Sequence, residues 1–160
     1  MKQLISIIGR SEFVEFPVLG LVHVPARIDT GAKTSSVWAS DIRITDGQLR
    51  FVLFDSPSKH FNGHEVVTRS FDKRMVASSN GMSEERYVVK LVVVLHGRKI
   101  NASFTLADRS SQAYPVLIGR NVLRGKFLVD VSQGQPLTKA EKARSQQLQA
   151  QLPNPTEEQV

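Results

Sequence analysis

The stretch ARIDTGAKTSS, residues 26–36, joins an apolar strand to an acid, a hydroxyl and a glycine. Gly31 lets the backbone turn tightly, Thr30 can hydrogen-bond across the loop, and Asp29 is left projecting into a cleft. A carboxylate held in this way can activate water. Because Asp, Thr and Gly are all common turn formers, the tripeptide by itself favours an ordinary turn at the end of a strand.

Outside this stretch, apolar residues recur at a period near two between Gly, Pro, Asn and Asp residues, which is typical of short strands. The pattern predicts strands at residues 4–8, 19–28, 41–45, 50–54, 65–71, 74–77, 86–96, 99–106, 116–118 and 127–131. Tight turns are expected at Asp46-Gly47, Asn62-Gly63, Asn80-Gly81 and His96-Gly97. One short helix is expected at residues 120–124, and the spacing of the strands predicts an all-β, closed or nearly closed fold.

Length and composition indicate one globular domain. The 160 residues are 41% hydrophobic and 22% charged, which is ordinary for a folded domain. We expect the domain at residues 1–132 and a tail at 133–160, where Thr138 and Glu141 form a capping box for a helix running to about residue 152. The longest apolar run, residues 88–95, is too short to span a bilayer. The lack of cysteine favours a cytoplasmic location.

The net charge of +6 lies in the body of the chain and favours an acidic peptide, nucleic acid or an anionic membrane as partner. The aromatic residues are not interleaved with basic ones, so sequence-specific nucleic-acid binding has little support. We expect them to fill the core instead: Trp38, Phe51, Phe54, Phe61, Phe71 and Phe104.

A second motif follows later in the chain. YPVLIGRNVL, residues 114–123, is an apolar strand, a glycine and a short helix. Together with Asp29-Thr30-Gly31, and in this order, it resembles the retropepsin pattern, in which such a strand lies behind the catalytic loop. The wider match, over residues 4–132, is to the retropepsin-like family often labelled ATP-dependent zinc protease.

The closer resemblance rests on Ile8-Gly9-Arg10, residues 27–36, Leu106-Ala107-Asp108-Arg109, residues 116–120 and Val129-Asp130-Val131-Ser132. It implies a closed six-stranded acid-protease barrel and a peptidase whose catalytic loop holds Asp29, Thr30 and Gly31. Members of this family accompany an ATP-grasp glutamate ligase of the ribosomal-modification type. The resemblance therefore implies an acidic substrate, the α-linked oligoglutamate tail of a ribosomal protein, and the ligase as partner.

The family label names ATP and zinc, but the sequence contains no known binding motif for either. The chain has no cysteine and no His-Glu-x-x-His motif. His60 and His64 flank a turn and could join an acid at a metal, but two exposed turn histidines are the favoured interpretation. No Gly-rich phosphate loop is present, so any ATP dependence would belong to the ligase. We therefore predict neither metal nor cofactor.

Aspartic peptidases need two carboxylates that share one proton, and this chain has a single Asp-Thr-Gly. Either two chains pair and each contributes Asp29, as retropepsins do, or a second acid of the same chain substitutes. Asp108 is the candidate for that second route, because it follows an apolar strand and precedes the strand expected beneath Asp29. An exposed turn is the equal alternative for Asp108.

Four further residues are candidates for substrate binding: Arg27, Lys33, Ser35 and Arg109. Arginine can hold a carboxylate through two parallel hydrogen bonds, and lysine adds a point charge. Solvated surface positions are the alternative for these cations. A different function class also stays open, a non-catalytic barrel that binds and regulates the ligase and keeps Asp29 for loop architecture.

Overall fold

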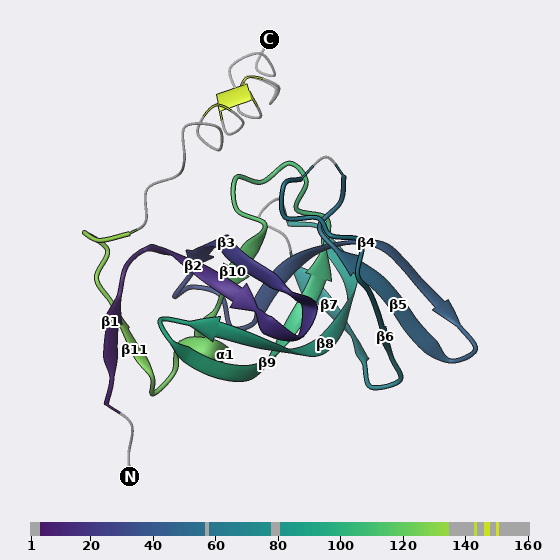
Figure 1. Ribbon diagram of the computed structural model, residues 1–160, viewed down its shortest axis with the longest axis horizontal. Coiled ribbons are helices and arrows are strands. Elements are labelled where there is room, and N and C mark those ends of the chain that lie inside the picture. The colour runs from purple at the N-terminus through teal and green to yellow at the C-terminus, as the bar shows by residue number, and fades with distance from the viewer. Residues whose placement is uncertain are drawn as a thin grey trace.

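The computed structural model describes residues 4–56, 58–77 and 81–134, together with residues 143, 146, 147 and 150. The described elements are mostly strands, with one short α-helix, α1, and one 3-10 turn, η1 (Figure 1). Their bounds are β1 (Ser6–Ile8), β2 (Ser11–Phe16), η1 (Pro17–Leu19), β3 (Leu21–Ile28), β4 (Ser35–Thr45), β5 (Gln48–Leu53), β6 (Glu65–Thr68), β7 (Asp72–Ala77), β8 (Ser83–Leu95), β9 (Arg98–Ala107), β10 (Val116–Ile118), α1 (Arg120–Leu123) and β11 (Phe127–Val129).

Six strands pair into a closed ring. The order is β10, β3, β2, β8, β9 and β4, and β4 pairs with β10 to complete it. β5 and β6 continue outward from β4, while β7 pairs with β8. The predicted all-β, closed six-stranded fold with one short helix is therefore confirmed.

The short strand β10 lies between β3 and β4. It runs parallel to β3, with Val116 opposite Ala26, and antiparallel to β4, with Val116 opposite Val37. β3 and β4 are the strands on either side of residues 29–34. The motif at residues 114–123 is thus brought beneath the Asp-Thr-Gly segment by the pairing of the sheet.

The core fills the ring with large apolar side chains. Phe16, Phe51, Phe54 and Phe104 are completely buried, and Trp38 is nearly so. Phe71 is half-buried against this core, whereas Phe61 is exposed in the connection between β5 and β6. The core prediction is therefore confirmed for most of the aromatic residues and wrong for Phe61.

Two stretches of strand do not show the alternation of apolar and polar residues from which the other strands are predicted. β2 was not predicted, because its ladder with β3 is irregular between Val14 and Phe16 and its buried residues do not alternate. The first half of β4, residues 35–39, is buried on both faces and so shows no alternation either. The Asp46-Gly47 and His96-Gly97 turns are confirmed, since all four residues have positive φ.

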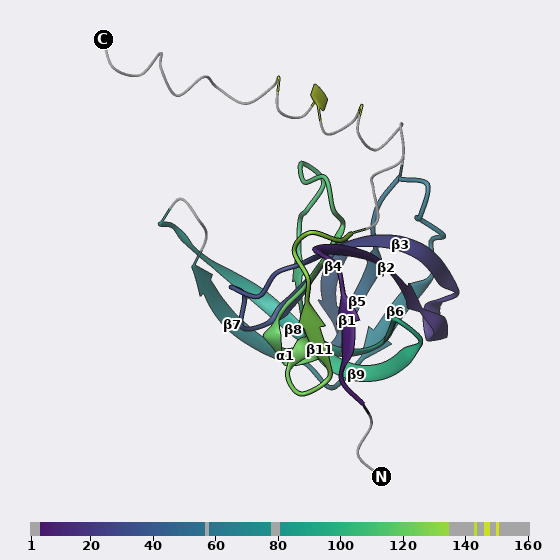
Figure 2. The same cartoon turned by 90° about the vertical axis from the view of Figure 1, so that its left-hand side faces the viewer.

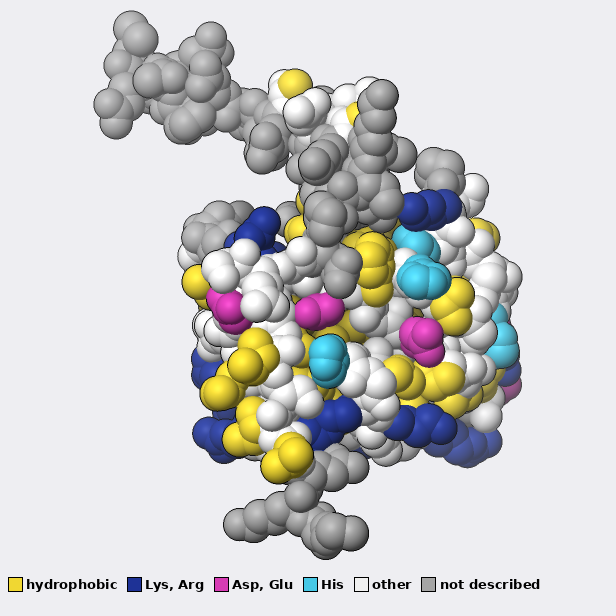
Figure 3. All heavy atoms as spheres, turned by 60° about the vertical axis from the view of Figure 1, so that its left-hand side comes forward, with side chains coloured by type: hydrophobic (Ala, Val, Ile, Leu, Met, Phe, Trp, Pro, Cys, Tyr) yellow, Lys and Arg dark blue, Asp and Glu magenta, His cyan; other side chains and the backbone are white. Residues whose placement is uncertain are grey.

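The two ends of the domain meet. β1 runs parallel to β11, with Ile7 opposite Leu128. The pair lies at one side of the ring in Figure 1 and faces the viewer in Figure 2. Several apolar side chains in and next to this pair are exposed to solvent: Leu4, Ile5, Ile7, Leu128 and Val131. Hydrophobic side chains gather near the N-terminal end of the molecule in Figure 3.

The predicted tail helix, with its capping residues Thr138 and Glu141, lies almost entirely outside the described residues. Asn80 of the fourth predicted turn lies outside them as well. In the part of the chain that is described, no helix has the length and apolar character needed to cross a membrane.

Candidate active site

The segment of residues 29–34, here called the Asp29 loop, leaves the end of β3 and is fixed at once to β10. The Asp29 amide donates to the Ile118 carbonyl at 2.8 Å. The Gly31 amide donates to Asp29 Oδ1 at 2.9 Å, and the Ala32 amide to the Asp29 carbonyl at 3.3 Å. Asp29 itself is half-buried, while Thr30 and Gly31 are exposed. The carboxylate is thus oriented by its own loop at the rim of the ring.

The underside of the Asp29 loop packs on the start of α1. A Cβ on Gly119 would lie 2.8 Å from the Ala32 carbonyl oxygen and from backbone atoms of Thr34. The missing side chain therefore permits backbone to touch backbone. The Arg120 amide donates to that Ala32 oxygen at 2.8 Å, and the Asn121 amide to the Lys33 carbonyl at 3.2 Å.

Ser35 belongs to this support. Its side chain is completely buried, its hydroxyl donates to Asn121 Oδ1 at 2.8 Å, and it accepts from the Gly119 amide at 2.9 Å. The Ser35 amide also donates to Asn121 Oδ1, at 3.0 Å. A hydroxyl engaged in this way positions the loop, and its burial does not fit the predicted contact with substrate.

Two supporting residues were not among the candidates. Arg120 Nη1 donates to the carbonyls of Thr30 and Gly31, at 3.1 and 3.0 Å. Asn121 Nδ2 donates to the Ser103 carbonyl at 2.8 Å, which ties the loop to β9 as well. Their place directly after Gly119 in the second motif was the available signal.

The first and last motifs meet on the other flank of the loop. The Arg10 carbonyl accepts from the Ile28 amide at 2.9 Å, and the Arg10 amide donates to the Gln133 carbonyl at 2.7 Å. A Cβ on Gly9 would lie 2.5 Å from backbone atoms of Gln133. The motifs at residues 8–10 and 116–120 therefore both contact the segment that carries Asp29.

Arg109 lies within electrostatic reach of Asp29 and of two further arginines. Burial lowers the pKa of Arg109 to about 10; the charges of Arg86 and Arg27 act in the same direction, and that of Asp29 opposes them. Arg109 Nε donates to the Tyr114 carbonyl at 3.0 Å, which holds the half-buried guanidinium in place. Arg109 thus lies within electrostatic reach of the Asp29 carboxylate, and the other predicted cation, Arg27, lies within reach of Arg109.

Asp108 lies in a different setting. Its exposed carboxylate accepts from the Ser110 amide at 2.9 Å, and the hydrogen bonds from Ser110 lower its pKa. It lines a cavity of about 310 Å³ together with Trp38, Asp41 and Asp55. Among the described residues no hydrogen bond joins Asp108 to Asp29, so its part in catalysis stays a prediction.

Comparison with known proteins agrees with this convergence of motifs. Residues 7–139 match the RimB-like family, described as the retropepsin-like aspartic endopeptidase RimB. The chain belongs to the RimB-like family.

Named relatives extend the comparison. A probable alpha-L-glutamate ligase of Shewanella pealeana is 38% identical over 133 residues, and one of Desulfotalea psychrophila is 33% identical over 130. These matches cover 79% and 78% of this chain but 29% and 28% of the ligases, so the chain spans less than a third of the curated relatives it matches. A crystal structure of a Legionella pneumophila protein of unknown function has a TM-score of 0.64 at 25% identity, covering 81% of this chain and 95% of that one.

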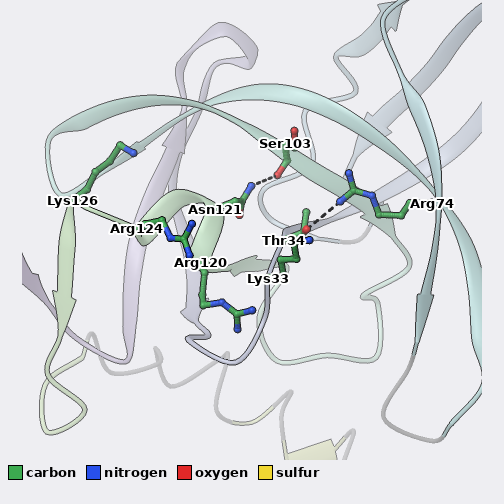
Figure 4. A pocket seen from close by; sticks show the side chains of 8 residues that line it. All are labelled: Lys33, Thr34, Arg74, Ser103, Arg120, Asn121, Arg124 and Lys126. Atoms are coloured by element: carbon green, nitrogen blue, oxygen red, sulfur yellow. Dashed lines mark hydrogen bonds between the residues drawn. The ribbon is translucent and has the colours of Figure 1, made fainter.

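A basic cavity opens on the other side of the Asp29 loop of this RimB-like domain. It measures about 520 Å³ and is lined by Lys33, Thr34, Arg74, Ser103, Arg120, Asn121, Arg124 and Lys126. In Figure 4, Arg74 reaches in from one side, and Arg120, Arg124 and Lys126 lie on the other. The predicted binding residue Lys33 thus lines this cavity, whereas Arg27 and Arg109 do not.

The surroundings of His60 and His64 decide whether these side chains could hold a metal ion. The His60 ring lies edge-on to Phe54, with centroids 6.0 Å apart, and His64 is exposed. Across residues 4–56, 58–77 and 81–134, no three His, Asp or Glu side chains are grouped so that they could hold a metal ion. The donor set around His60 and His64 therefore does not fit zinc.

The predicted Asn62-Gly63 turn and the β7–β8 hairpin lie differently with respect to Asp29. Asn62 Nδ2 donates to the Leu19 carbonyl at 2.8 Å, next to the start of β3, the end opposite to Asp29. Arg74 of β7 instead donates to Thr34 Oγ1 at 3.2 Å. The β7–β8 hairpin is therefore the one that contacts the Asp29 loop.

Proposed function

We propose that this RimB-like chain is an aspartic peptidase that hydrolyses acidic peptides and trims α-linked oligoglutamate tails on a ribosomal protein. The observation that carries the proposal is the Asp29 loop, whose carboxylate is oriented by the Gly31 amide and whose backbone is held by β10 and α1. A preorganised carboxylate in a fixed loop is what water activation requires. The endopeptidase description of the matching family supports the same reaction.

In the proposed reaction, ionised Asp29 takes a proton from water while the water oxygen bonds to the peptide carbonyl carbon. A second, protonated carboxyl hydrogen-bonds to the carbonyl oxygen as negative charge develops there. The tetrahedral intermediate then breaks its carbon–nitrogen bond, and the leaving amine takes a proton from Asp29. Thr30 and Gly31 hold the loop geometry, and Arg120 fixes their carbonyls.

The identity of the second carboxyl divides two versions of this proposal. Hydrogen bonds from Ser110 lower the pKa of Asp108 and keep it ionised, which is unsuited to a carboxyl that must carry a proton. This favours Asp29 of a second chain over Asp108. The exposed apolar residues in and next to the β1–β11 pair offer a surface on which two chains could associate.

An acidic substrate follows from the cations. Arg109 lies within electrostatic reach of Asp29, Arg27 and Arg86, and the basic cavity adds further positive charge beside the Asp29 loop. An oligoglutamate presents one carboxylate per residue, and arginine binds carboxylates bidentately. The relatives named as glutamate ligases supply a chemical source for that tail.

A second function is supported by those same relatives. Their ligases contain a region similar to this chain within a much longer protein. We therefore also propose that the chain binds an ATP-grasp glutamate ligase, and in a non-catalytic version it regulates the ligase without cleaving anything. Under that version Asp29→Asn leaves ligase binding and stimulation unchanged.

The test is mass spectrometry of a synthetic oligo-α-glutamate incubated with the wild-type protein, with Asp29→Asn and with a chelator. Ladder products that vanish only with Asp29→Asn support the peptidase. Products that vanish only with the chelator contradict it. If folded protein gives no products, with or without the ligase, the peptidase is rejected and the regulatory function is favoured.

Mixing separates the two sources of the second carboxyl. If two chains share one site, excess Asp29→Asn protein suppresses wild-type turnover, because mixed pairs hold a single working carboxyl. If Asp108 supplies the second carboxyl, excess Asp29→Asn protein does not suppress the turnover of the wild-type protein, and Asp108→Asn abolishes cleavage. Sedimentation of the same mixtures gives the oligomeric state.

A further inference from the structure

The basic cavity beside the Asp29 loop concentrates charge that the fold leaves uncompensated. Five of its lining residues are cations: Lys33, Arg74, Arg120, Arg124 and Lys126. The lining includes no Asp or Glu, and within residues 4–56, 58–77 and 81–134 none of the five forms an ion pair. Like charges gathered around one hollow repel each other, so an anion placed there would be strongly attracted.

Some other cations of the protein are paired with acids. Arg43 and Arg50 both pair with Glu65, at 2.5 and 2.8 Å, and Lys73 lies 3.6 Å from Glu85. The basic cavity therefore differs from these parts of the protein, where acids accompany bases.

The contacts of the basic cavity also connect it to the candidate catalytic carboxylate. Lys33 and Thr34 are in the Asp29 loop, and Arg120 holds the carbonyls of Thr30 and Gly31 while lining the hollow. A peptide lying over Asp29 would therefore carry its neighbouring side chains into the cavity. In an extended peptide, side chains on one face repeat every two residues, or about 7 Å, so several can enter along its length.

We propose that the basic cavity is a subsite for the carboxylates of successive acidic residues on one side of the bond that is cleaved. This rests on the proposed peptidase function and adds a specificity to it. Because the site binds several carboxylates away from the reacting bond, cleavage requires an acidic run of a minimum length. The cavity would thus set the shortest tail that the enzyme can trim. Its volume of about 520 Å³ lies in the range of ligand sites in proteins.

The test uses the double variant Arg124→Gln/Lys126→Gln. Neither side chain has a hydrogen bond to the Asp29 loop among the described residues, so the loop is left in place. The matched control is Arg69→Gln/Lys99→Gln, which removes the same charge from exposed positions outside the cavity. Oligo-α-glutamates of increasing length, and a single-stranded RNA of similar charge, serve as probes.

Binding is measured first in the Asp29→Asn background, so that it does not depend on catalysis. We expect the cavity variant to weaken binding of the long oligoglutamate by about tenfold, as loss of charge-assisted hydrogen bonds predicts, while the control stays close to the parent. Equal weakening in both variants would show a diffuse charge effect and overturn the subsite. RNA binding that exceeds oligoglutamate binding and is lost in the cavity variant would overturn the assignment to acidic peptides.

Turnover then tests the length requirement. With active protein, kcat/KM should rise with peptide length, and the cavity variant should lose this rise through a higher KM at unchanged kcat. A variant that keeps the full length dependence contradicts the proposal. Binding that depends on the cavity in a protein that cleaves nothing would retain the subsite and reject the peptidase.

Discussion

Asp29 and Asp108 have the same local structure in different surroundings. Each follows the end of a ring strand, and each accepts a hydrogen bond at 2.9 Å from the amide two residues later. The loop after Asp29 is fixed by Ile118, Gly119, Arg120 and Asn121, which come from β10 and α1. The carboxylate of Asp108 is held by Ser110 in its own turn.

The difference lies in what packs beneath the turn. A local Asx turn orients a carboxylate, but it does not fix the turn relative to a partner group or a substrate. The β10–α1 segment supplies that fixation for Asp29, because a glycine there lets backbone approach backbone. A tripeptide match becomes meaningful only when the second segment that supports it is present.

The largest expected effect comes from exchanging the two acids for amides. Asp29→Asn should lower kcat/KM for an oligoglutamate by about 10³-fold, the range of a lost general base, while circular dichroism stays that of the wild type. Asp108→Asn should stay within about twofold, because a substitution outside the reacting groups removes no transition-state contact. Equal losses from both variants would place the two carboxylates in one site and break the comparison.

The next effect comes from the close approach at Gly119. A Cβ there would lie 2.8 Å from backbone atoms of Ala32 and Thr34, so Gly119→Ala must displace the loop. We expect about 1–3 kcal/mol of lost stability from the overpacking and about a hundredfold lower turnover from the misplaced carboxylate. Denaturant unfolding and peptide assays measure the two.

Gly97→Ala is the matched control for Gly119→Ala. It has a positive φ, but nothing lies within 4 Å of its added Cβ. It should cost about 1–2 kcal/mol through backbone strain and leave turnover unchanged in the folded protein. Lost turnover in this control would mean that any destabilisation disables the site. It would contradict the proposal that the close approach at Gly119 specifically positions the Asp29 loop.

A smaller effect is expected at Asn121. Asn121→Ala removes the acceptor of both the Ser35 amide and the Ser35 hydroxyl. An unpaired buried donor costs about 1–3 kcal/mol, so unfolding in urea should shift to a lower midpoint at unchanged slope. Asn121→Asp keeps the acceptor and should recover part of that loss. No recovery would show that the donor to the Ser103 carbonyl is the more important contact.

The sequence predicted the closed all-β fold and the packing of residues 114–123 beneath Asp29, whereas the roles of the site residues stay predictions. Asp29 and residues 114–123 were found because both patterns are local, an acid before a tight turn and a strand before a glycine. β2 was missed because its buried residues do not alternate, and the start of β4 because both of its faces are buried.

Tertiary contacts account for the residues whose roles were not foreseen. Ser35 was expected to bind substrate, but register with β9 and contact with Asn121 bury it. Arg120 and Asn121 support the loop across more than 80 positions of sequence, since Asn121 reaches Ser35 and Arg120 reaches Thr30. A local pattern does not specify such long-range pairings, although the place of Arg120 and Asn121 directly after Gly119 was an available signal. The side chain of Asn121 by itself looks like an ordinary exposed residue on a short helix.

The smallest effect concerns pH and separates the two acids again. Hydrogen bonds from Ser110 lower the pKa of Asp108 below its ordinary value of 3.8. A carboxyl whose folded pKa is depressed stabilises the fold above its unfolded pKa, and that contribution is lost as pH falls through the folded value.

Asp108→Asn should therefore cost less than about 1 kcal/mol near neutral pH, given solvent screening. The difference from the wild type should shrink to nothing well below pH 3.8, as urea unfolding at stepped pH would measure. A difference that stays constant across that range would mean that the Ser110 amide bonds the neutral side chain equally well, and that the turn at Asp108 does not depend on charge.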